Sequence, residues 1–504
     1  IKIIMSGYST DRSQMEVEGA DARAQMTGAV PDLVRIGQIP SNTAIDIETD
    51  ILDPVVHSDT FCRFQLQSKG ILHSHSKIVL RLANSTANGF FPAGVGIHSL
   101  IDRCSLKVGT RTLSEIDDYN HYMGYKSMFM SNEHQKEREQ FVSGRCISHK
   151  SYYDDGQTFP GFAGQSDTSA SFVGLDIGVY PSASGVVMDT SGDVSLRPCQ
   201  KTSNVIGGPE YQISLADLFP FLYTNQLPLY MMKEPVTIEL HFSGTLARVV
   251  RTSGVGATAV TIDQTATQLI ADYQYFPQEM MEEYAVQNRE MTFTYVDYRL
   301  AKRSLTSASS GSEVATGQQI MNLGGAGRVA TKVMAMVSCE EVTNENILGN
   351  YHAFGMKRDY SSASDVVFNG TLTSNIKYND TFLYPIDVSN SARLFHETQK
   401  AEGMVPFVTR EEYSNEGVTT TPVKFNGHKQ DGVASGLVSK FFYQAYHLHK
   451  NERVNSRGIE YYFNYDKLPG SVGASGGNTY TLRTYIELMR IATLTDGMID
   501  TMFA

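Results

Sequence analysis

Apolar and polar residues alternate in short segments along most of the chain. Residues 60–67 (TFCRFQLQ) and 235–242 (PVTIELHF) change character at nearly every position, and this period of two is typical of a strand with one buried face. Similar segments, separated by turn residues, predict further strands at 76–83, 100–108, 111–116, 211–215, 268–276, 291–296, 328–339, 366–378, 438–449 and 458–465. The pattern therefore predicts an all-β protein.

Few segments have helical character. Residues 117–139 form a moderately amphipathic stretch that is rich in Met and Tyr, and residues 389–400 form a shorter one. Pro277 opens a third, residues 277–288, because proline suits a first helical turn. The glutamates that follow it lie where the helix dipole favours acids. We expect short helices in the connections between strands.

The distribution of these elements predicts an arm and two domains. Residues 1–50 contain small, polar and proline-punctuated segments and are interpreted as an N-terminal arm. Many short strands with few helices favour one large sandwich in residues 51–285 and another in 286–504, with the helix at 277–288 as the boundary. Residues 148–208, rich in Gly, Ser and Asp, are either an elaborated surface loop or several short strands.

An internal repeat supports two similar halves. Residues 106–113 (LKVGTRTL) align with residues 376–383 (IKYNDTFL), and each copy precedes a predicted short helix. Gly109 and Asn379 end the apolar–Lys–apolar part, and both residue types accept the left-handed backbone of a tight hairpin. We expect these two residues in the same hairpin turn of each half, with Lys107 and Lys377 on matching strand faces.

The composition excludes several classes of protein. The 504 residues include 42 Lys plus Arg and 54 Asp plus Glu, a net charge of −12. Binding nucleic acid through its phosphates needs a basic footprint, so we expect no direct sequence-specific contact with nucleic acid. With 41% apolar and 19% charged residues, the chain can bury a large core and is not expected to be disordered.

The cysteines and the apolar segments bear on the compartment. The five cysteines are scattered and form no C-x-x-C pair, so we expect neither a disulfide framework nor a thiolate metal site, and a reducing compartment suits the chain. They are Cys62, Cys104, Cys146, Cys199 and Cys339. Residues 218–232 form the most apolar uncharged run, but its 15 residues include two prolines. A bilayer needs roughly 20, so we expect a soluble protein without a transmembrane segment or a secretory signal.

Two catalytic motifs occur in unsuitable surroundings. Residues 473–477 (GASGG) fit the pattern of an esterase nucleophile at Ser475, but that chemistry needs a strand before the serine and a helix after it. A flexible loop explains the segment better. Residues 325–330 (GAGRVA) resemble a dinucleotide fingerprint, but a predicted strand follows where a helix is required. We therefore predict no catalytic and no cofactor-binding residues.

Candidate metal and acid–base residues are equally weak. His73 with His75, and His447 with His449, would each place two imidazoles on one face of a strand, which is too few for a closed zinc site. Paired acids occur at 117–118, 154–155, 282–283 and 340–341. They lack the differently buried partner that acid–base catalysis requires, and we interpret them as solvated helix starts and turns. No metal site is predicted.

Several segments taken in order carry a family resemblance. They are 99–109 (SLIDRCSLKVG), 116–119 (IDDY), 217–222 (DLFPFL) with 226–229 (QLPL), 269–276 (LIADYQYF) and 454–459 (VNSRGI). Together they resemble the major capsid proteins of eukaryotic double-stranded DNA viruses, a group that includes virophages, polinton-like viruses and the nucleocytoplasmic large DNA viruses. The segments touch about a third of the chain and span both halves.

The resemblance implies two consecutive eight-stranded jelly rolls with a few short helices. It also implies a homotrimeric, pseudo-hexagonal capsomer that contacts neighbouring capsomers, minor capsid proteins and penton proteins in an icosahedral virion assembled inside the host cell. The 51 Tyr plus Phe residues suit broad subunit interfaces. The alternative is a viral fibre or lectin-like carbohydrate-binding β-protein, although such sites usually use Trp, which this chain lacks. A β-rich hydrolase would depend on Ser475 alone.

Overall fold

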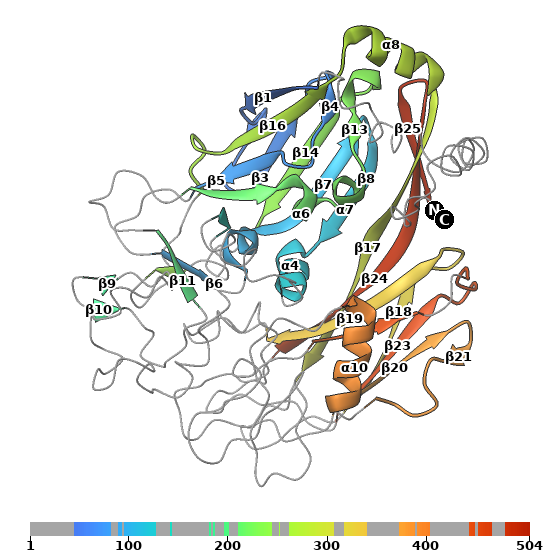
Figure 1. Ribbon diagram of the computed structural model, residues 1–504. Coiled ribbons are helices and arrows are strands. Elements are labelled where there is room, and N and C mark those ends of the chain that lie inside the picture. Colours follow the sequence, from blue (N-terminus) through green and yellow to red (C-terminus); the bar gives the residue numbers. More distant parts are fainter. Residues whose placement is uncertain are drawn as a thin grey trace, which may run out of the picture.

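Two β-sandwiches stacked end to end make up the computed structural model (Figure 1). Within each sandwich the strands pair only in antiparallel fashion wherever the structure describes them. The described residues are 45–81, 89–92, 95–127, 142–143, 181–182, 185–186, 196–200, 210–243, 251–252, 262–306, 317–339, 372–388, 391–403, 443–448, 452–465 and 479–503.

The first sandwich consists of two facing sheets. One has the order β12-β5-β16-β4-β13 with β1 also on β16, and the other has the order β2-β3-β14-β7-β8. The strands are β1 (Asp46–Leu52), β2 (Val56–His57), β3 (Phe61–Gln65), β4 (Ile71–Leu72), β5 (Lys77–Leu80), β7 (Ile101–Val108), β8 (Arg111–Asp117), β12 (Tyr211–Ser214), β13 (Leu227–Pro228), β14 (Val236–Phe242) and β16 (Gln268–Tyr275).

The second sandwich is built in the same way. Its sheets have the orders β17-β24-β19-β22, with β25 also on β24, and β18-β23-β20-β21. The strands are β17 (Glu290–Thr306), β18 (Gly317–Gly324), β19 (Ala330–Cys339), β20 (Leu372–Tyr378), β21 (Thr381–Phe382), β22 (Tyr443–His447), β23 (Ile459–Tyr465), β24 (Thr479–Thr495) and β25 (Met498–Phe503).

Both sandwiches have the topology of a jelly roll. When the eight main strands are counted in chain order, each roll has a sheet in the order 1-8-3-6 facing a sheet in the order 2-7-4-5. In the first roll these strands are β1, β3, β5, β7, β8, β12, β14 and β16, and in the second they are β17 to β24. The predicted all-β fold of two consecutive eight-stranded jelly rolls is therefore confirmed.

The internal repeat is confirmed in both of its parts. Gly109 (φ 57°) and Asn379 (φ 48°) each occupy the turn between the fourth and fifth strands of their roll, β7–β8 and β20–β21. Lys107 and Lys377 also have equivalent partners, because each contacts a glutamate on the seventh strand. The Lys107–Glu239 contact measures 2.5 Å and the Lys377–Glu460 contact 3.6 Å.

Short helices lie in the connections, as predicted. They are α4 (Tyr119–Ser127), α6 (Leu215–Leu218), α7 (Pro220–Thr224), α8 (Gln278–Gln287) and α10 (Ser391–Glu402). Helix α8 matches the one predicted at 277–288, with Pro277 as its N-cap. Helix α4 accounts for the start of the predicted 117–139 helix, and residues 128–141 lie outside the described residues. None of the described helices has the length and apolar character needed to cross a membrane.

Four segments differ from the sequence predictions or extend them. Strands β18 and β24 were not predicted, and β24 is one of the two longest in the described chain. Strand β1 begins at Asp46 and pairs with β16, so residues 46–50 of the predicted arm belong to the first sheet. Within 148–208 the structure describes only β9 (Pro181–Ser182), β10 (Gly185–Val186) and β11 (Leu196–Gln200). The boundaries 51–285 and 286–504 stay a prediction.

Two apolar cores fill the sandwiches. The second core lies within the second roll and contains Tyr461, Phe463 and Leu482. The first core fills the first roll around Phe64 and Ile238 and continues into side chains of the second roll, which are Met291, Phe293, Tyr295, Met334, Met336, Ala445, Tyr485, Ala492, Leu494 and Ile499. Cys62 and Cys104 are free thiols buried in this core; the other three cysteine side chains lie outside the described residues.

Candidate functional site at the junction of the two jelly rolls

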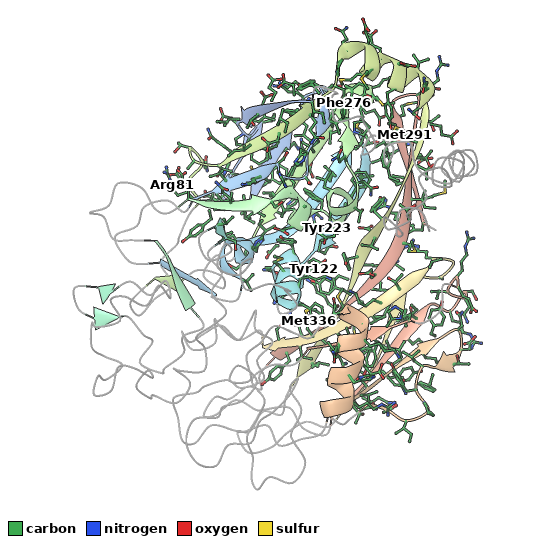
Figure 2. All side chains as sticks on the ribbon, in the orientation of Figure 1. Arg81, Tyr122, Tyr223, Phe276, Met291 and Met336 are labelled. Carbon is green, nitrogen blue, oxygen red and sulfur yellow. The ribbon has the colours of Figure 1, made fainter. Side chains whose placement is uncertain are left out.

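The junction between the rolls begins as an apolar contact that continues the first core. Strand β17 runs along α7 and β8 of the first roll (Figures 1 and 2). The Phe221 ring on α7 meets Phe293 and Tyr295 edge-on, with ring centroids 5.6 and 5.0 Å apart. The Tyr295 hydroxyl donates to the Leu113 carbonyl oxygen at 2.6 Å. The two rolls therefore share a packed face.

A buried ion network, which we call the junction network, crosses this face. Lys332 Nζ on β19 lies 3.0 Å from Glu402 Oε1 on α10 and 3.4 Å from Glu487 Oε2 on β24. The first roll contributes α4, from which Lys126 Nζ lies 3.4 Å from Glu402 Oε2 and the Tyr125 hydroxyl donates to Glu402 Oε1 at 2.8 Å. The junction network thus contains two lysines and two glutamates, so its charges sum to zero, and Lys126 is the member from the first roll.

Further hydrogen bonds satisfy the oxygens of this network. The Tyr298 hydroxyl donates to Glu487 Oε2 at 2.8 Å, and Thr331 Oγ1 donates to Glu487 Oε1 at 2.6 Å. Burial opposes ionisation of Glu402, but Lys126 and Lys332 outweigh it and hold the pKa of Glu402 below its ordinary value. Burial, together with the charge of Lys332, lowers the pKa of Lys126. The glutamates are therefore ionised because the lysines are present.

A second polar contact joins the rolls where α4 begins. Asp118, which has a φ of 47°, lies 2.6 Å from Lys302 Nζ and 2.9 Å from Arg483 Nε. The Tyr485 hydroxyl donates to the Asp118 carbonyl oxygen at 2.8 Å. The paired acids at 117–118 were predicted to be a solvated helix start, which is wrong for Asp118. Its carboxylate is mostly buried because the second roll supplies the two cations.

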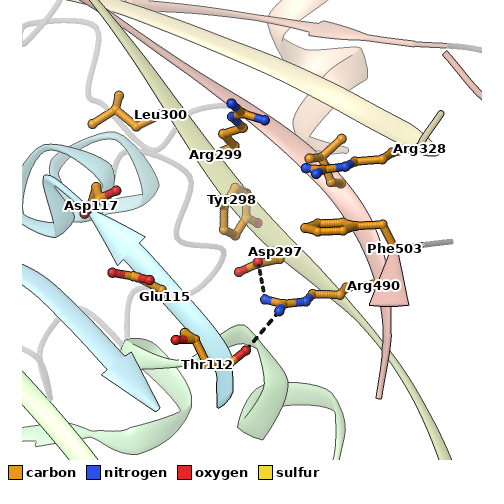
Figure 3. Close-up of a pocket in the computed structure, with 11 residues that line it drawn as sticks. Thr112, Glu115, Asp117, Asp297, Tyr298, Arg299, Leu300, Arg328, Arg490 and Phe503 are labelled. Carbon is orange, nitrogen blue, oxygen red and sulfur yellow. Dashed lines mark hydrogen bonds and ion pairs between the residues drawn. The ribbon is translucent and has the colours of Figure 1, made fainter. Parts of the chain in front are cut away.

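A pocket of about 370 Å³ opens beside these contacts (Figure 3). Arg490 on β24 lines the pocket and its charge is neutralised: Nη1 lies 2.9 Å from Asp297 Oδ2, and Nη2 donates to the Thr112 carbonyl oxygen at 2.9 Å. The other lining residues come from β8, β17, the β18–β19 turn, β24 and β25, and are Glu115, Asp117, Tyr298, Arg299, Leu300, Arg328, Leu488 and Phe503. Both rolls therefore contribute to the pocket.

Two carboxyl groups near the junction make stability depend on pH. Burial raises the pKa of Asp297 to about 6, although Arg490 opposes the shift. Burial and the charge of Asp118 raise the pKa of Asp102 to about 6. A raised pKa means that the folded state holds the proton more tightly than the unfolded chain. The contribution is therefore present at acid pH and is lost as pH rises through about 6.

We expect Asp297→Asn to remove this dependence at its site. Between pH 5 and pH 8 the wild type should lose about 1.4 kcal/mol of unfolding free energy relative to the variant, because Asn carries no titrating proton. Urea unfolding at several pH values measures the difference, and Asp102→Asn provides a second, separate site. The raised pKa of Asp297 would be contradicted if the difference in unfolding free energy between wild type and variant did not change with pH. It would also be contradicted if the variant became the more stable of the two as the pH falls.

The structure does not bring the sequence-predicted motif residues together. His73 and His75 lie in the turn between β4 and β5, where the His75 backbone N–H donates to His73 Nδ1 at 3.1 Å, so the prediction that they share a strand face is wrong. His447 ends β22, and His449 and Ser475 lie outside the described residues. Residues 325–330 form a turn and enter β19 rather than a helix. The described part of the chain holds no group of three potential metal ligands.

The residues of the junction network were missed by sequence analysis. They come from α4, β19, α10 and β24, and each is a single charged residue among unrelated neighbours. A local signal exists only in β24, where Arg483, Glu487 and Arg490 interrupt an otherwise uncharged run. Charged residues in a buried strand need a charged partner, because such side chains are almost never fully buried unless they are paired.

Comparisons with known proteins agree with the topology. The sequence matches no family model and no curated protein. Among solved structures, the chain has the fold of double jelly-roll capsid proteins. It is similar to PBCV-1 VP54, a crystal structure of which was fitted into a reconstruction of the virophage Sputnik, with a TM-score of 0.50, 10% identity and coverage of 92% of this chain and 98% of that one.

Two further structures give the same result. The Faustovirus major capsid protein matches with a TM-score of 0.50 and 10% identity, covering 93% of this chain and 96% of that one. A chain of the Sputnik virophage structure matches with a TM-score of 0.50 and 12% identity, covering 92% and 90%. The likeness extends over nearly the whole of each chain, so both rolls take part in it.

Proposed function

We propose that the chain is a major capsid protein that assembles with copies of itself into an icosahedral virus shell. The observation that carries this proposal is the pair of topologically identical jelly rolls in one chain, matched over 92% or more of its length by the fold of capsid proteins. The same likeness supports the capsid function over a viral fibre or lectin-like protein.

The subunit is a rigid building block in this proposal. Residues 51–285 and 286–504 form the two rolls, and residues 1–50 form an arm whose last residues enter β1. The junction network supports a fixed angle between the rolls, because its charged groups, which are mostly buried, must stay paired. A fixed angle gives every copy the same contact surfaces. The role is structural, without catalysis and without a cofactor.

We further propose a homotrimer with a pseudo-hexagonal outline as the assembling unit. Three subunits with two similar rolls each present six similar corners. Neighbouring capsomers, minor capsid proteins and penton proteins are the partners, and the virion is the location, assembled inside the host cell. Exposed apolar side chains on β1, on the residues that flank it and at the start of β2 support a subunit contact there: Ile45, Ile47, Ile51, Val55 and Val56.

Light scattering of the purified protein is expected to give about three times the chain mass of 55.7 kDa. The trimer should persist on dilution to micromolar concentration, because capsomer contacts bury large areas. Negative-stain images should show a six-cornered outline. A stable monomer at that concentration would contradict the proposed assembly.

A matched pair of variants locates the contact. Ile51→Asp introduces a charge at a side chain that is 64% exposed, and Val286→Asp does the same on α8, also at 64%. Since both positions are exposed, both variants should fold. Only Ile51→Asp is expected to lower the trimer fraction, because a charge in a buried subunit contact lacks a partner. A trimer retained in Ile51→Asp would contradict a contact along β1.

A further inference from the structure

Three guanidinium groups line the pocket at the junction, and only one of them is neutralised. Arg490 is paired with Asp297 and bonded to the Thr112 carbonyl oxygen. The guanidinium groups of Arg299 and Arg328 make no hydrogen bond and no ion pair with any residue that the structure describes. Their N–H groups are therefore available to a ligand, and an unpaired guanidinium is a strong donor to oxyanions.

Arg328 is held in place in spite of having no ionic partner. Its guanidinium carbon lies 3.6 Å from the centre of the Phe503 ring, which is a cation–π contact. Its backbone N–H donates to the Gly325 carbonyl oxygen at 3.0 Å, and the Gly327 N–H donates to the Val454 carbonyl oxygen at 2.8 Å. The glycine-rich turn at residues 325–330, whose sequence resembles a dinucleotide fingerprint, thus positions the Arg328 guanidinium. The side chain loses little freedom when a ligand binds.

The guanidinium groups that line the pocket repel one another. Burial, with the charges of Arg299 and Arg490, lowers the pKa of Arg328. Gly324 leaves room for Arg299, because a Cβ at Gly324 would lie 3.3 Å from Arg299 Nη1. In Figure 3 the side chains of Arg299 and Arg328 both lie in the upper part of the view, with Arg328 over the Phe503 ring. An anion between them would relieve the mutual repulsion.

We propose that this pocket binds a small, multiply charged oxyanion between Arg299 and Arg328, with the Phe503 ring holding the Arg328 guanidinium in place. A volume of about 370 Å³ equals that of roughly a dozen water molecules, at about 30 Å³ each, so a small polyanion has room in it. Glu115 is occupied by Arg103 at 3.4 Å, whereas Asp117 on the same wall stays free to accept a hydroxyl group. A phosphate ester or polycarboxylate that also carries a hydroxyl group fits this arrangement.

Such a ligand would fasten the two rolls together. Arg299 and Arg328 belong to the second roll, and Asp117 belongs to β8 of the first. A molecule that contacts both walls binds only when the rolls have their native angle. Binding to the folded state alone raises the stability of the protein with the logarithm of the ligand concentration, once that concentration exceeds the dissociation constant.

Isothermal titration calorimetry on the full-length protein tests the proposal. The probes are pyrophosphate and citrate, at an ionic strength held constant with sodium chloride, so that a general salt effect is excluded. We expect saturable binding of at least one probe. Arg328→Gln and Arg299→Gln should each weaken it at least tenfold, and Arg328→Lys should fall between the wild type and Arg328→Gln, because lysine keeps the charge but not the fork of donors.

The matched control is Arg457→Gln, another exposed arginine of the second roll, which is paired with Asp380 at 2.7 Å outside the pocket. The affinity of the Arg457→Gln variant for the probe should stay within twofold of that of the wild type. Thermal midpoints measured without ligand confirm that each variant is folded. Binding of pyrophosphate alone assigns a phosphate ligand, and binding of citrate alone assigns a carboxylate ligand.

Two results would overturn the proposal. One is the absence of saturable binding of both probes to the wild type. The other is undiminished binding in the Arg299→Gln/Arg328→Gln double variant, which would place the anion elsewhere. Neither result bears on shell assembly, because the trimer is measured separately and in the absence of ligand.

Discussion

Lys332→Met should lower the free energy of unfolding by about 3–5 kcal/mol, the usual cost of removing one partner from a buried ion pair. The Lys332 side chain is only 8% exposed, and that of its partner Glu402 only 4%. Without Lys332, Glu402 and Glu487 face each other with Lys126 as the one remaining cation of the junction network. Methionine fills a similar volume, so the loss comes from the charge.

Thermal unfolding measures the effect as a fall of roughly 10 °C in the midpoint for a domain of this size. The control is Arg457→Met, which removes the cation of an exposed pair with Asp380 and should cost less than about 1 kcal/mol. Adding Glu402→Gln to Lys332→Met should restore part of the lost stability, because the charges then balance again. Equal midpoints for Lys332→Met and Arg457→Met would show that the junction network does not stabilise the junction.

Much of the fold could be predicted from the sequence because many strands have one buried and one polar face. Strand β3 alternates through Cys62, Arg63 and Phe64, and Cys62 and Phe64 are the buried members. The β7–β8 hairpin was predicted from Gly109 at a position where the backbone takes a positive φ. In such segments the local pattern and the tertiary environment agree, which is the condition under which pattern analysis succeeds.

Strand β24 could not be predicted, for a physical reason. In its central part both faces are buried, so Arg483, Thr484 and Tyr485 are all buried in succession and the alternation is lost. Its charged residues find their partners on other elements: Arg483 on Asp118, Glu487 on Lys332 and Arg490 on Asp297. Only the Arg483–Asp118 pair crosses between the rolls, whereas the other two join β24 to its neighbours β19 and β17 in the same sheet. All three pairs join residues far apart in the sequence, so no short window of sequence contains them.

The candidate sites differ in the same respect, because some depend on local sequence and others on how distant elements meet. The motifs that sequence analysis could recognise, around Ser475 and the histidine pairs, were judged on local context. The pocket depends on Arg299, Arg328 and Asp117, which lie on three elements and have no common spacing. The nearest local signal was the glycine-rich segment at 325–330. The segment was correctly predicted to lead into a strand and not a helix. Its role in placing Arg328 against Phe503 depends on β25, which is distant in the sequence.

Gly458→Ala should destabilise the second roll by about 3–4 kcal/mol. Gly458 has a φ of +79°, and a Cβ there would lie 2.7 Å from the Gly324 carbonyl oxygen. The left-handed backbone alone costs an L-residue roughly 1–2 kcal/mol, and forced contacts in a packed region add about 1–3 kcal/mol. The backbone around Gly324 has little freedom to move, because its N–H donates to Asn322 Oδ1 at 2.8 Å.

Gly327→Ala separates the two contributions. Gly327 has nearly the same φ, +73°, but a Cβ there would meet no atom within 4 Å. It should therefore cost only the roughly 1–2 kcal/mol of the backbone conformation. Urea unfolding of the two variants gives the difference, and about 2 kcal/mol of it belongs to the contact with Gly324. Strands β18 and β23 meet at Gly324 and Ile459, next to Gly458. Equal losses of stability in the two variants would mean that this strand pair moves apart to admit the added methyl group. The close approach of Gly458 to Gly324 would then not fix the turn that carries Arg328.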